Sequence, residues 1–320
     1  HFNLGGKTKW YGAAVLRFAP HEFDADPAHQ CRGWPIGYCD LAPYYEQAEQ
    51  LLRVREFACE PDLARISSRM CGRRSGWHAK PLPMALSPDI LGDRQEAAHF
   101  DGFATVRDLK ADAENVLIRP IADAPGFTLL TRAAVEALLP AADDARRIDG
   151  VRLTDGREFR ARHVLLAAGA LHSPRLLENY LRSRSLQGSP TASVGRNLKL
   201  HLLTAMVAVS PSRKTDLIRK TTVLLNDAYP HSSVQALGFD AELIANLIPK
   251  FVPRTIARLV GERAYGFFLQ TEDGSSHDNR VCAAADGAAL PVMNYDDRRV
   301  EAARREHRRF VFGLKRALLG

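Results

Sequence analysis

The spacing of apolar side chains predicts a helix near each end of the chain. Apolar residues recur at three- and four-residue intervals at Tyr44, Ala48, Leu51 and Leu52. Asp40 suits the N-cap of this helix and Pro43 its first turn, so we predict a helix over about 40–54. A second helix is predicted over 297–319, with arginines on its outer side. Its apolar face comprises Val300, His307, Phe310, Val311, Leu314 and Leu318.

The middle of the chain shows the two-residue alternation of β-strands. The segments "GVRLT" and "REFRA", within 150–161, flank an Asp-Gly pair and predict a hairpin. We also predict a short strand at "FTLLT" (127–131), and a strand or a helix for the apolar pattern at 133–139. The segment 194–209 is expected to form a turn and a strand. A sheet with a helix near 247–262 is expected within 210–296.

One apolar run predicts a ligand-binding turn. The run "HVLLAAGA" (163–170) has the continuous hydrophobicity of a buried strand, and a helix is predicted after it, with Ser173 as N-cap and Pro174 at its first position. Backbone N–H groups at the start of a helix face outward and favour an anion. The small residues there would let a flat or phosphorylated ligand come close: Ala167, Ala168, Gly169 and Ala170.

In contrast, residues 58–110 are rich in Gly, Pro, Arg and Ser and are expected to be irregular. Three prolines within 80–88 exclude a regular helix or a central strand there. Trp34, Tyr44 and Tyr45 are expected to anchor the predicted helix of 40–54 in the core.

Composition narrows the class of protein. The 320 residues are 46% hydrophobic and 25% charged, which is typical of a globular chain, and no apolar run is long enough for a membrane span. Five cysteines form no CxxC pair and no HExxH occurs, so we expect no structural metal, reduced thiols and a cytoplasmic location. We interpret the net charge of +7 as a solvated basic surface and not as a nucleic-acid site.

Five segments in order resemble one family, the glucose–methanol–choline (GMC) flavoprotein oxidoreductases. They are "GGKTKWYGAAVLRF", "WPIGYCDLAPYYEQAEQLL", "HVLLAAGALHSPRLL", "VGRNLKLH" and "TEDGSSHDNRV". The resemblance implies FAD as cofactor, an alcohol or sugar as substrate, an electron acceptor that stays unknown, and hydride transfer from the CH–OH group to flavin N5. It also implies an α/β fold in which a FAD-binding domain, in pieces 1–20 and 115–209, is interleaved with a substrate domain built on a mostly antiparallel sheet, in pieces 21–114 and 210–320.

Nine residues are candidate FAD contacts. Glycines permit close backbone approach, Thr8 offers a hydroxyl and Tyr11 an aromatic ring. The resemblance adds a backbone contact from Val135 to the adenine, and it places the turn at 168–169 near the ribose and pyrophosphate. The full set is Gly5, Gly6, Thr8, Tyr11, Gly12, Val135, Ala168, Gly169 and Ser173.

Two marks of the family are not found in the sequence. No G-x-G occurs, although a G-x-G-x-x-G loop opens the family's FAD domain. The family's catalytic histidine would lie beyond Gly320, so no catalytic residue is assigned, and His172 and His201 are interpreted as structural. Because the chain begins at His1, we interpret it as an internal part of a GMC enzyme. A truncated or decayed remnant of the fold is the alternative, and a basic nucleic-acid-binding protein a remote one.

Overall fold

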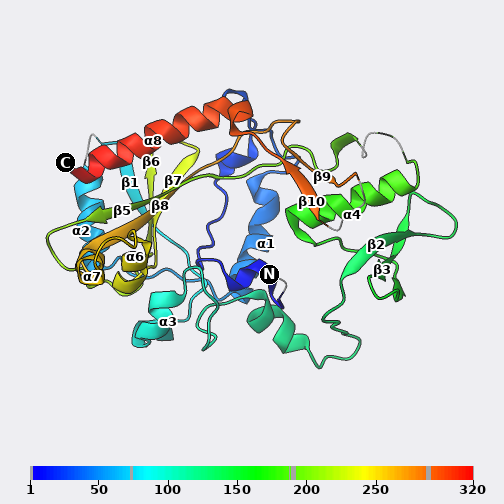
Figure 1. Ribbon diagram of the computed structural model, residues 1–320, viewed down its shortest axis with the longest axis horizontal. Coiled ribbons are helices and arrows are strands. Elements are labelled where there is room, and N and C mark those ends of the chain that lie inside the picture. Colours follow the sequence, from blue (N-terminus) through cyan, green and yellow to red (C-terminus); the bar gives the residue numbers. More distant parts are fainter. Residues whose placement is uncertain (1–2, 73–74, 187, 189–191, 286–289, 320) are drawn as a thin grey trace.

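A five-stranded antiparallel sheet organises the larger part of the protein. The computed structural model describes residues 3–72, 75–186, 188, 192–285 and 290–319. The strand order is β1-β6-β7-β8-β5, and all neighbours are antiparallel (Figure 1). The strands are β1 (Trp77–Pro81), β5 (Leu202–Val209), β6 (Thr222–Asn226), β7 (Ser232–Ala236) and β8 (Ala264–Thr271). With the helices described next, this confirms the predicted mixed α/β class.

Two helices cover one face of the sheet. Helix α2 (Pro61–Met70) and helix α8 (Glu301–Leu319) lie over this face and contact each other. Leu224, Val234 and Leu269 are direct neighbours across three strands and point into the same core. From α8, Phe310 and Leu314 are fully buried against them, because they lie on the apolar stripe that the helical spacing predicts.

The N-terminal segment covers part of the opposite face. Val223 of β6 points to this side and packs with Ala13, Leu82 and Phe100 in a second core. Phe100 directly follows helix α3 (Arg94–His99). This core joins the beginning of the chain to the large sheet.

A smaller unit is built from strands β2 to β4 and helix α4. Strands β2 (Val135–Pro140), β3 (Ile148–Leu153) and β4 (Glu158–Arg160) form an antiparallel sheet, and α4 (Gly169–Ser183) packs on β2. Leu138, Leu176 and Tyr180 form its buried centre. On its other side α4 contacts a two-stranded sheet of β9 (Arg280–Ala283) and β10 (Pro291–Asn294). In Figure 1 this unit lies at the opposite end from α2, α6 and α7.

The other helices lie outside these cores. Helix α1 (Tyr38–Leu51) has no buried residue, and α6 (Ala241–Leu247) and α7 (Arg254–Gly261) form a hairpin beside β8. Short 3-10 or π turns are η1 (Gly6–Lys9), η2 (Pro20–Phe23), η3 (Pro27–His29), η4 (Pro88–Gly92), η5 (Glu114–Ile118), η6 (Arg119–Ile121) and η7 (Asp297–Val300). No helix of the described residues has the length and apolarity needed to cross a bilayer.

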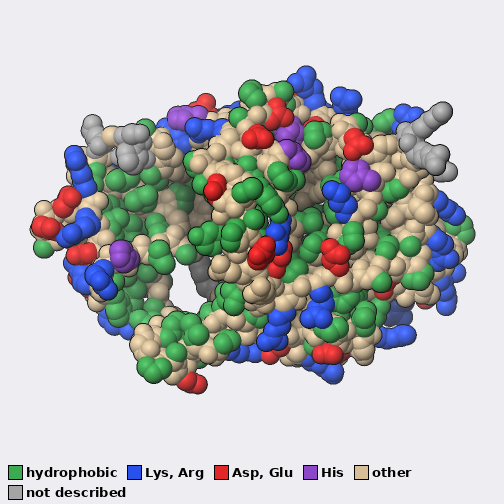
Figure 2. Space-filling model, turned by 180° about the vertical axis from the view of Figure 1, so that it is seen from behind, with side chains coloured by type: hydrophobic (Ala, Val, Ile, Leu, Met, Phe, Trp, Pro, Cys, Tyr) green, Lys and Arg blue, Asp and Glu red, His purple; other side chains and the backbone are tan. Residues whose placement is uncertain are grey.

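Several predicted details of α1 are wrong. The helix begins at Tyr38, and Asp40 lies inside its first turn, where the carboxylate accepts the Gly37 N–H at 2.8 Å. Asp40 therefore caps from the third helical position and is not the N-cap itself. Trp34 is 52% exposed and Tyr44 64%, so neither is a core anchor. Figure 2 shows many such hydrophobic side chains on the surface.

Regular structure also appears where the sequence predicts none. Residues 58–110 contain α2, β1, η4 and α3. Pro81 is tolerated in β1 because this strand lies at the edge of the sheet. Conversely, "FTLLT" at 127–131 is not a strand.

The predicted buried strand at 163–170 is the largest error. The segment up to 168 is irregular, and Leu165 is 91% exposed. An apolar run can be buried as a strand only if neighbouring strands pair with it, and no strand of the described residues does so. Helix α4 begins at Gly169 with Ala168 as N-cap, so Ser173 and Pro174 lie inside the helix instead of starting it.

The pattern predicts other elements well. Helix α8, the hairpin of β3 and β4, strand β5 and helix α7 all form where expected, and the open choice at 133–139 is a strand. Strand β5 pairs with β8 over its whole length and so belongs to the large sheet. The proposed division into interleaved pieces stays a prediction.

A cluster of ionised side chains joins η3, β7, β8 and α8. The His231 ring lies 2.9 Å from Asp26 Oδ2 through Nε2 and 3.4 Å from Glu272 Oε2 through Nδ1. The Glu306 carboxylate accepts the backbone N–H of His231 at 3.1 Å and the Ser232 hydroxyl at 2.8 Å. Hydrogen bonds to Glu272 and Asp26 raise the pKa of His231 to about 9 despite its partial burial.

Three potential metal ligands meet in this cluster. Atoms of His29, Cys31 and His231 lie within 4.8 Å of one another. However, the two imidazole rings stack with centroids 3.7 Å apart and planes at 15°. The lone pairs of ring nitrogens lie in the ring planes, so stacked rings do not direct them at one point. We therefore interpret the group as an ion-pair cluster around a protonated His231.

This interpretation predicts a pH-dependent stability. Because the folded-state pKa of His231 lies above its unfolded value, its contribution is complete below about pH 6.5 and is lost as the pH rises through 9. His231→Gln should lower the free energy of unfolding at pH 7 by roughly 2 kcal/mol and flatten the decline between pH 7 and 9.5. Urea unfolding across this range measures both effects. His78→Gln, at an exposed pair with Asp227, is the control and should change neither.

Candidate functional site

The glycine-rich loop near the N-terminus has a backbone that only glycine accepts readily. Gly5 has φ +79° and Gly6 has φ +55°, both in the left-handed region. The two residues lead into turn η1. A Cβ on Gly5 would lie 3.2 Å from the Glu114 backbone nitrogen, so the loop also packs closely against that segment.

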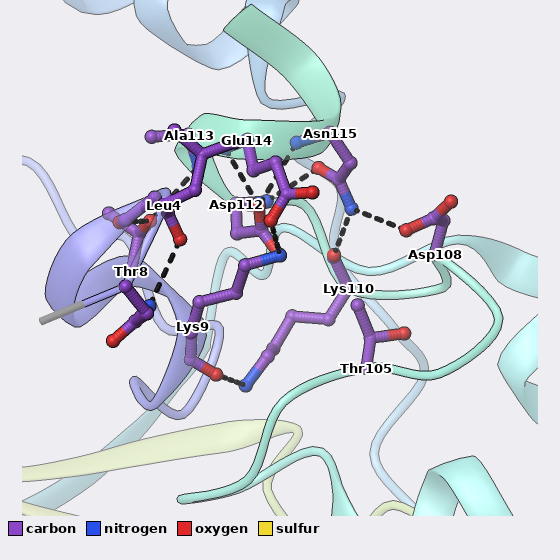
Figure 3. Close-up of polar contacts among 12 residues, drawn as sticks. Leu4, Thr8, Lys9, Thr105, Asp108, Lys110, Asp112, Ala113, Glu114 and Asn115 are labelled. Carbon is purple, nitrogen blue, oxygen red and sulfur yellow. Dashed lines mark hydrogen bonds and ion pairs between the residues drawn. The ribbon is translucent and has the colours of Figure 1, made fainter. Parts of the chain in front are cut away.

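Polar contacts fasten this loop to residues 112–115. Thr8 Oγ1 accepts the Ala113 N–H at 3.0 Å and donates to the Gly5 carbonyl. The Lys9 ammonium lies 3.0 Å from Asp112 Oδ2 and 2.5 Å from Glu114 Oε2 (Figure 3). The Thr8 hydroxyl and the Lys9 ammonium thus already have partners within the protein. Thr8 in this conformation holds the loop in place.

A fully buried lysine lies under the same loop. Lys110 Nζ donates to four backbone carbonyls: Lys9 at 3.1 Å, Tyr11 at 2.8 Å, Phe100 at 2.7 Å and Phe103 at 2.5 Å. Burial lowers the pKa of Lys110 to about 8, against the opposing effect of nearby carboxylates. The ammonium joins the loop to the end of α3. Sequence reasoning missed this residue because a lysine in a polar stretch carries no sign of burial.

Tyr11 and Gly12 complete the packing. The Tyr11 hydroxyl donates to the Ala111 carbonyl at 2.6 Å, and its ring lies 5.4 Å from the Lys110 ammonium. Gly12 lies against a buried ion pair of Asp101 and Lys220, whose charged atoms are 2.9 Å apart. A Cβ on Gly12 would come within 2.1 Å of both side chains. Gly12 is therefore required for contact between protein segments, independently of any ligand.

The second group of predicted residues lies in the smaller unit. Val135 begins β2 and is opposite Leu153 of β3. Ala168 and Gly169 form the exposed start of α4, and Gly169 has φ +79° with open space where a Cβ would be. Ser173 Oγ donates to the Leu166 carbonyl at 3.4 Å. The structure thus brings the first five candidates together in one loop and the last four in another unit.

The two groups differ in what they offer a ligand. The first presents a fixed backbone whose polar side chains have protein partners. The second presents the first backbone N–H groups of a 15-residue helix, bordered by small exposed residues. Such N–H groups have no partner within the helix and bind phosphate readily. The start of α4 therefore fits a phosphate-bearing group, and no acidic side chain in its first turn opposes one.

Comparison with known proteins establishes the family. The family model described as GMC oxidoreductase matches residues 3–203, which contain all nine candidates. The chain therefore belongs to the GMC oxidoreductase family, as the five sequence segments indicate.

Three curated relatives are similar to the chain. It is 31% identical over 266 residues to 6'''-hydroxyparomomycin C oxidase of Streptomyces lividus, covering 71% of the chain and 48% of that protein. It is 32% identical over 226 residues to paromamine 6'-oxidase of Streptomyces fradiae, covering 62% and 41%. It is 26% identical over 238 residues to 2-methyl-1,2-propanediol dehydrogenase of Mycolicibacterium austroafricanum, covering 65% and 42%. The matches thus span less than half the length of each relative.

The Lys110 contacts predict a large loss of stability when the ammonium is removed. Lys110→Met would leave four carbonyls without their donor, so we expect the free energy of unfolding to fall by about 3 kcal/mol. Lys80→Met, at an exposed lysine of β1, is the matched control and should change stability by less than about 0.5 kcal/mol. Urea unfolding gives both values. Hydrogen exchange should also show faster exchange in residues 4–12 of the Lys110 variant, and equal stability of the two variants would contradict this role.

Proposed function

We propose that the chain is part of an FAD-dependent oxidoreductase that oxidises a CH–OH group of a small alcohol or sugar. The observation that carries the proposal is the open start of α4, where exposed small residues border the first backbone N–H groups of a helix whose N-cap makes no side-chain hydrogen bond. This feature lies inside the segment that the GMC family model matches. The fold alone would not indicate an activity, because one fold supports many functions.

Each group of candidate residues has a part in holding the cofactor. The N–H groups around Gly169 would bind the pyrophosphate, and Val135 would contact the adenine through its backbone. Gly5 and Gly6 would present a flat backbone to the flavin. The cofactor would supply the acceptor for the hydride of the alcohol. Lys110 would act on it only indirectly, by keeping the loop in one conformation.

The relatives support a polar alcohol as the substrate class. Two are named as oxidases, one of 6'''-hydroxyparomomycin C and one of paromamine, and the third as the dehydrogenase of 2-methyl-1,2-propanediol. All three names describe compounds with hydroxyl groups, so we propose a polyhydroxylated small molecule as substrate.

The nucleic-acid alternative gains no support from α8. Arg304 pairs with Asp297 and Glu301, and Arg308 also pairs with Glu301. Acidic partners thus offset part of the positive charge of this helix. A binding surface for nucleic acid would need an extended face of uncompensated cations.

Gly169 allows a matched test of FAD binding. Gly169→Ala would add a Cβ at the start of α4, so we expect FAD affinity of the longest natural form of the protein to fall at least tenfold. Gly156→Ala, in the turn between β3 and β4, is the control because Gly156 has a similar φ of +87° and the same open space. The Gly156→Ala variant should lose about as much stability as Gly169→Ala and should keep its FAD affinity. Flavin absorbance near 450 nm and fluorescence quenching measure binding.

The same experiment separates an enzyme from a remnant. Residues 1–320 alone are expected to retain FAD weakly. The longest natural form should bind one FAD per chain, and the bound flavin should lose its absorbance near 450 nm when a polyhydroxylated alcohol is added without oxygen. Absence of FAD from that form would favour the remnant.

A further inference from the structure

The hairpin of α6 and α7 presents apolar and basic side chains together on its outer side. Its inner side is packed: Ile244, Ala245 and Ala257 are buried, and a Cβ on Gly261 would come within 2.1 Å of the Ala241 carbonyl oxygen. The two helices therefore approach closely and form a rigid pair. A rigid hairpin fixes which side chains it presents to its surroundings.

Large apolar side chains lie on the outer side of this hairpin. Phe251, in the loop between the two helices, is 86% exposed. Leu247 at the end of α6 is 58% exposed, and Ile256 and Leu259 of α7 are 50% and 49% exposed. The last two are three residues apart and so lie on one face of α7, away from buried Ala257. Single exposed apolar residues are common, but four in one short hairpin are not explained by the packing of this chain.

Positive charge accompanies these apolar side chains. Lys250, Arg254 and Arg258 are exposed, and the sequence contains no acidic residue from 243 to 261. None of the ion pairs found among the described residues involves these three cations. The Arg254 guanidinium donates to the amide oxygen of Asn246 at 2.8 Å, and this neutral partner does not compensate the positive charge. In α8, by contrast, two of the arginines, Arg304 and Arg308, pair with acidic side chains.

We propose that the α6–α7 hairpin is a docking site for the surface of an anionic lipid membrane. Phe251, Leu247, Ile256 and Leu259 would enter the boundary between headgroups and acyl chains, while the three cations bind lipid phosphates and carboxylates. Exposed apolar side chains beside basic ones are typical of helices that lie on a membrane without crossing it, and the acidic residues Glu242 and Glu262 lie only at the two ends of the hairpin. The charge complementarity favours this partner over an uncharged apolar surface.

The position of the hairpin suits this role. In Figure 1, α6 and α7 lie at the end of the molecule opposite to α4 and the smaller unit. Binding there would leave the start of α4 open to water. The proposal is independent of the proposed redox function.

Vesicle co-sedimentation tests the proposal. We expect the whole chain to bind vesicles of phosphatidylcholine with 30% phosphatidylserine at least tenfold more strongly than vesicles of phosphatidylcholine alone. The triple variant K250Q/R254Q/R258Q should lose this preference. The variant F251S/L259S should bind at least tenfold more weakly at equal charge. Added salt should weaken the binding of the unmodified chain.

Two control variants keep the test specific. R69Q/R94Q/R146Q removes the same charge at three exposed arginines elsewhere, and V106S replaces an apolar side chain that is 87% exposed outside the hairpin. Both should bind like the unmodified chain. An equal loss of vesicle binding in the control and hairpin variants would overturn the proposal, and so would a lack of binding to anionic vesicles by the unmodified chain. Self-association that F251S/L259S abolishes, in the absence of vesicle binding, would instead identify a second copy of the chain as the partner.

Discussion

The buried ammonium of Lys110 is the interaction on which the candidate site depends most. Removing this charge from water is costly, and its lowered pKa reflects that cost. Four carbonyls from the N-terminal loop and from the end of α3 offset it. Without Lys110, those carbonyls would lack this hydrogen-bond donor in the interior. The ammonium and the four carbonyls therefore stabilise each other. The loop is thereby held to the large sheet through α3, although Lys110 lies 99 residues after Tyr11 in the sequence.

This constraint changes the interpretation of the glycine-rich loop. Its glycines first suggest approach to a ligand, yet Gly12 faces the ion pair of Asp101 and Lys220, and Gly5 faces Glu114. The close approach is therefore, at least on these sides, an approach of protein to protein. A rigid loop still suits a cofactor, because a wall that is already ordered loses little entropy when a ligand binds. Gly6, with open space beside it, is the position where a ligand could come nearest.

The sequence predicts those elements that local pattern determines. Helix α8 and the hairpin of β3 and β4 follow from periodicity and from a turn signal. Errors occur where a distant partner decides the structure. The apolar run before Gly169 resembles a buried strand, but pairing strands decide whether it becomes one. Lys110 and the Asp101–Lys220 pair could not be predicted either, because burial of a charge depends on residues far along the chain.

Strand β8 connects the features that make this chain distinctive. It begins directly after α7, and the residue that follows it, Glu272, belongs to the His231 cluster. Between these points β8 pairs with β5 and β7, so the hairpin and the ionic cluster are fixed to one rigid sheet. A membrane bound at the hairpin would therefore set the orientation of the whole sheet. Since α4 lies at the other end of the molecule, its exposed start would stay open to water while the hairpin is bound to a membrane.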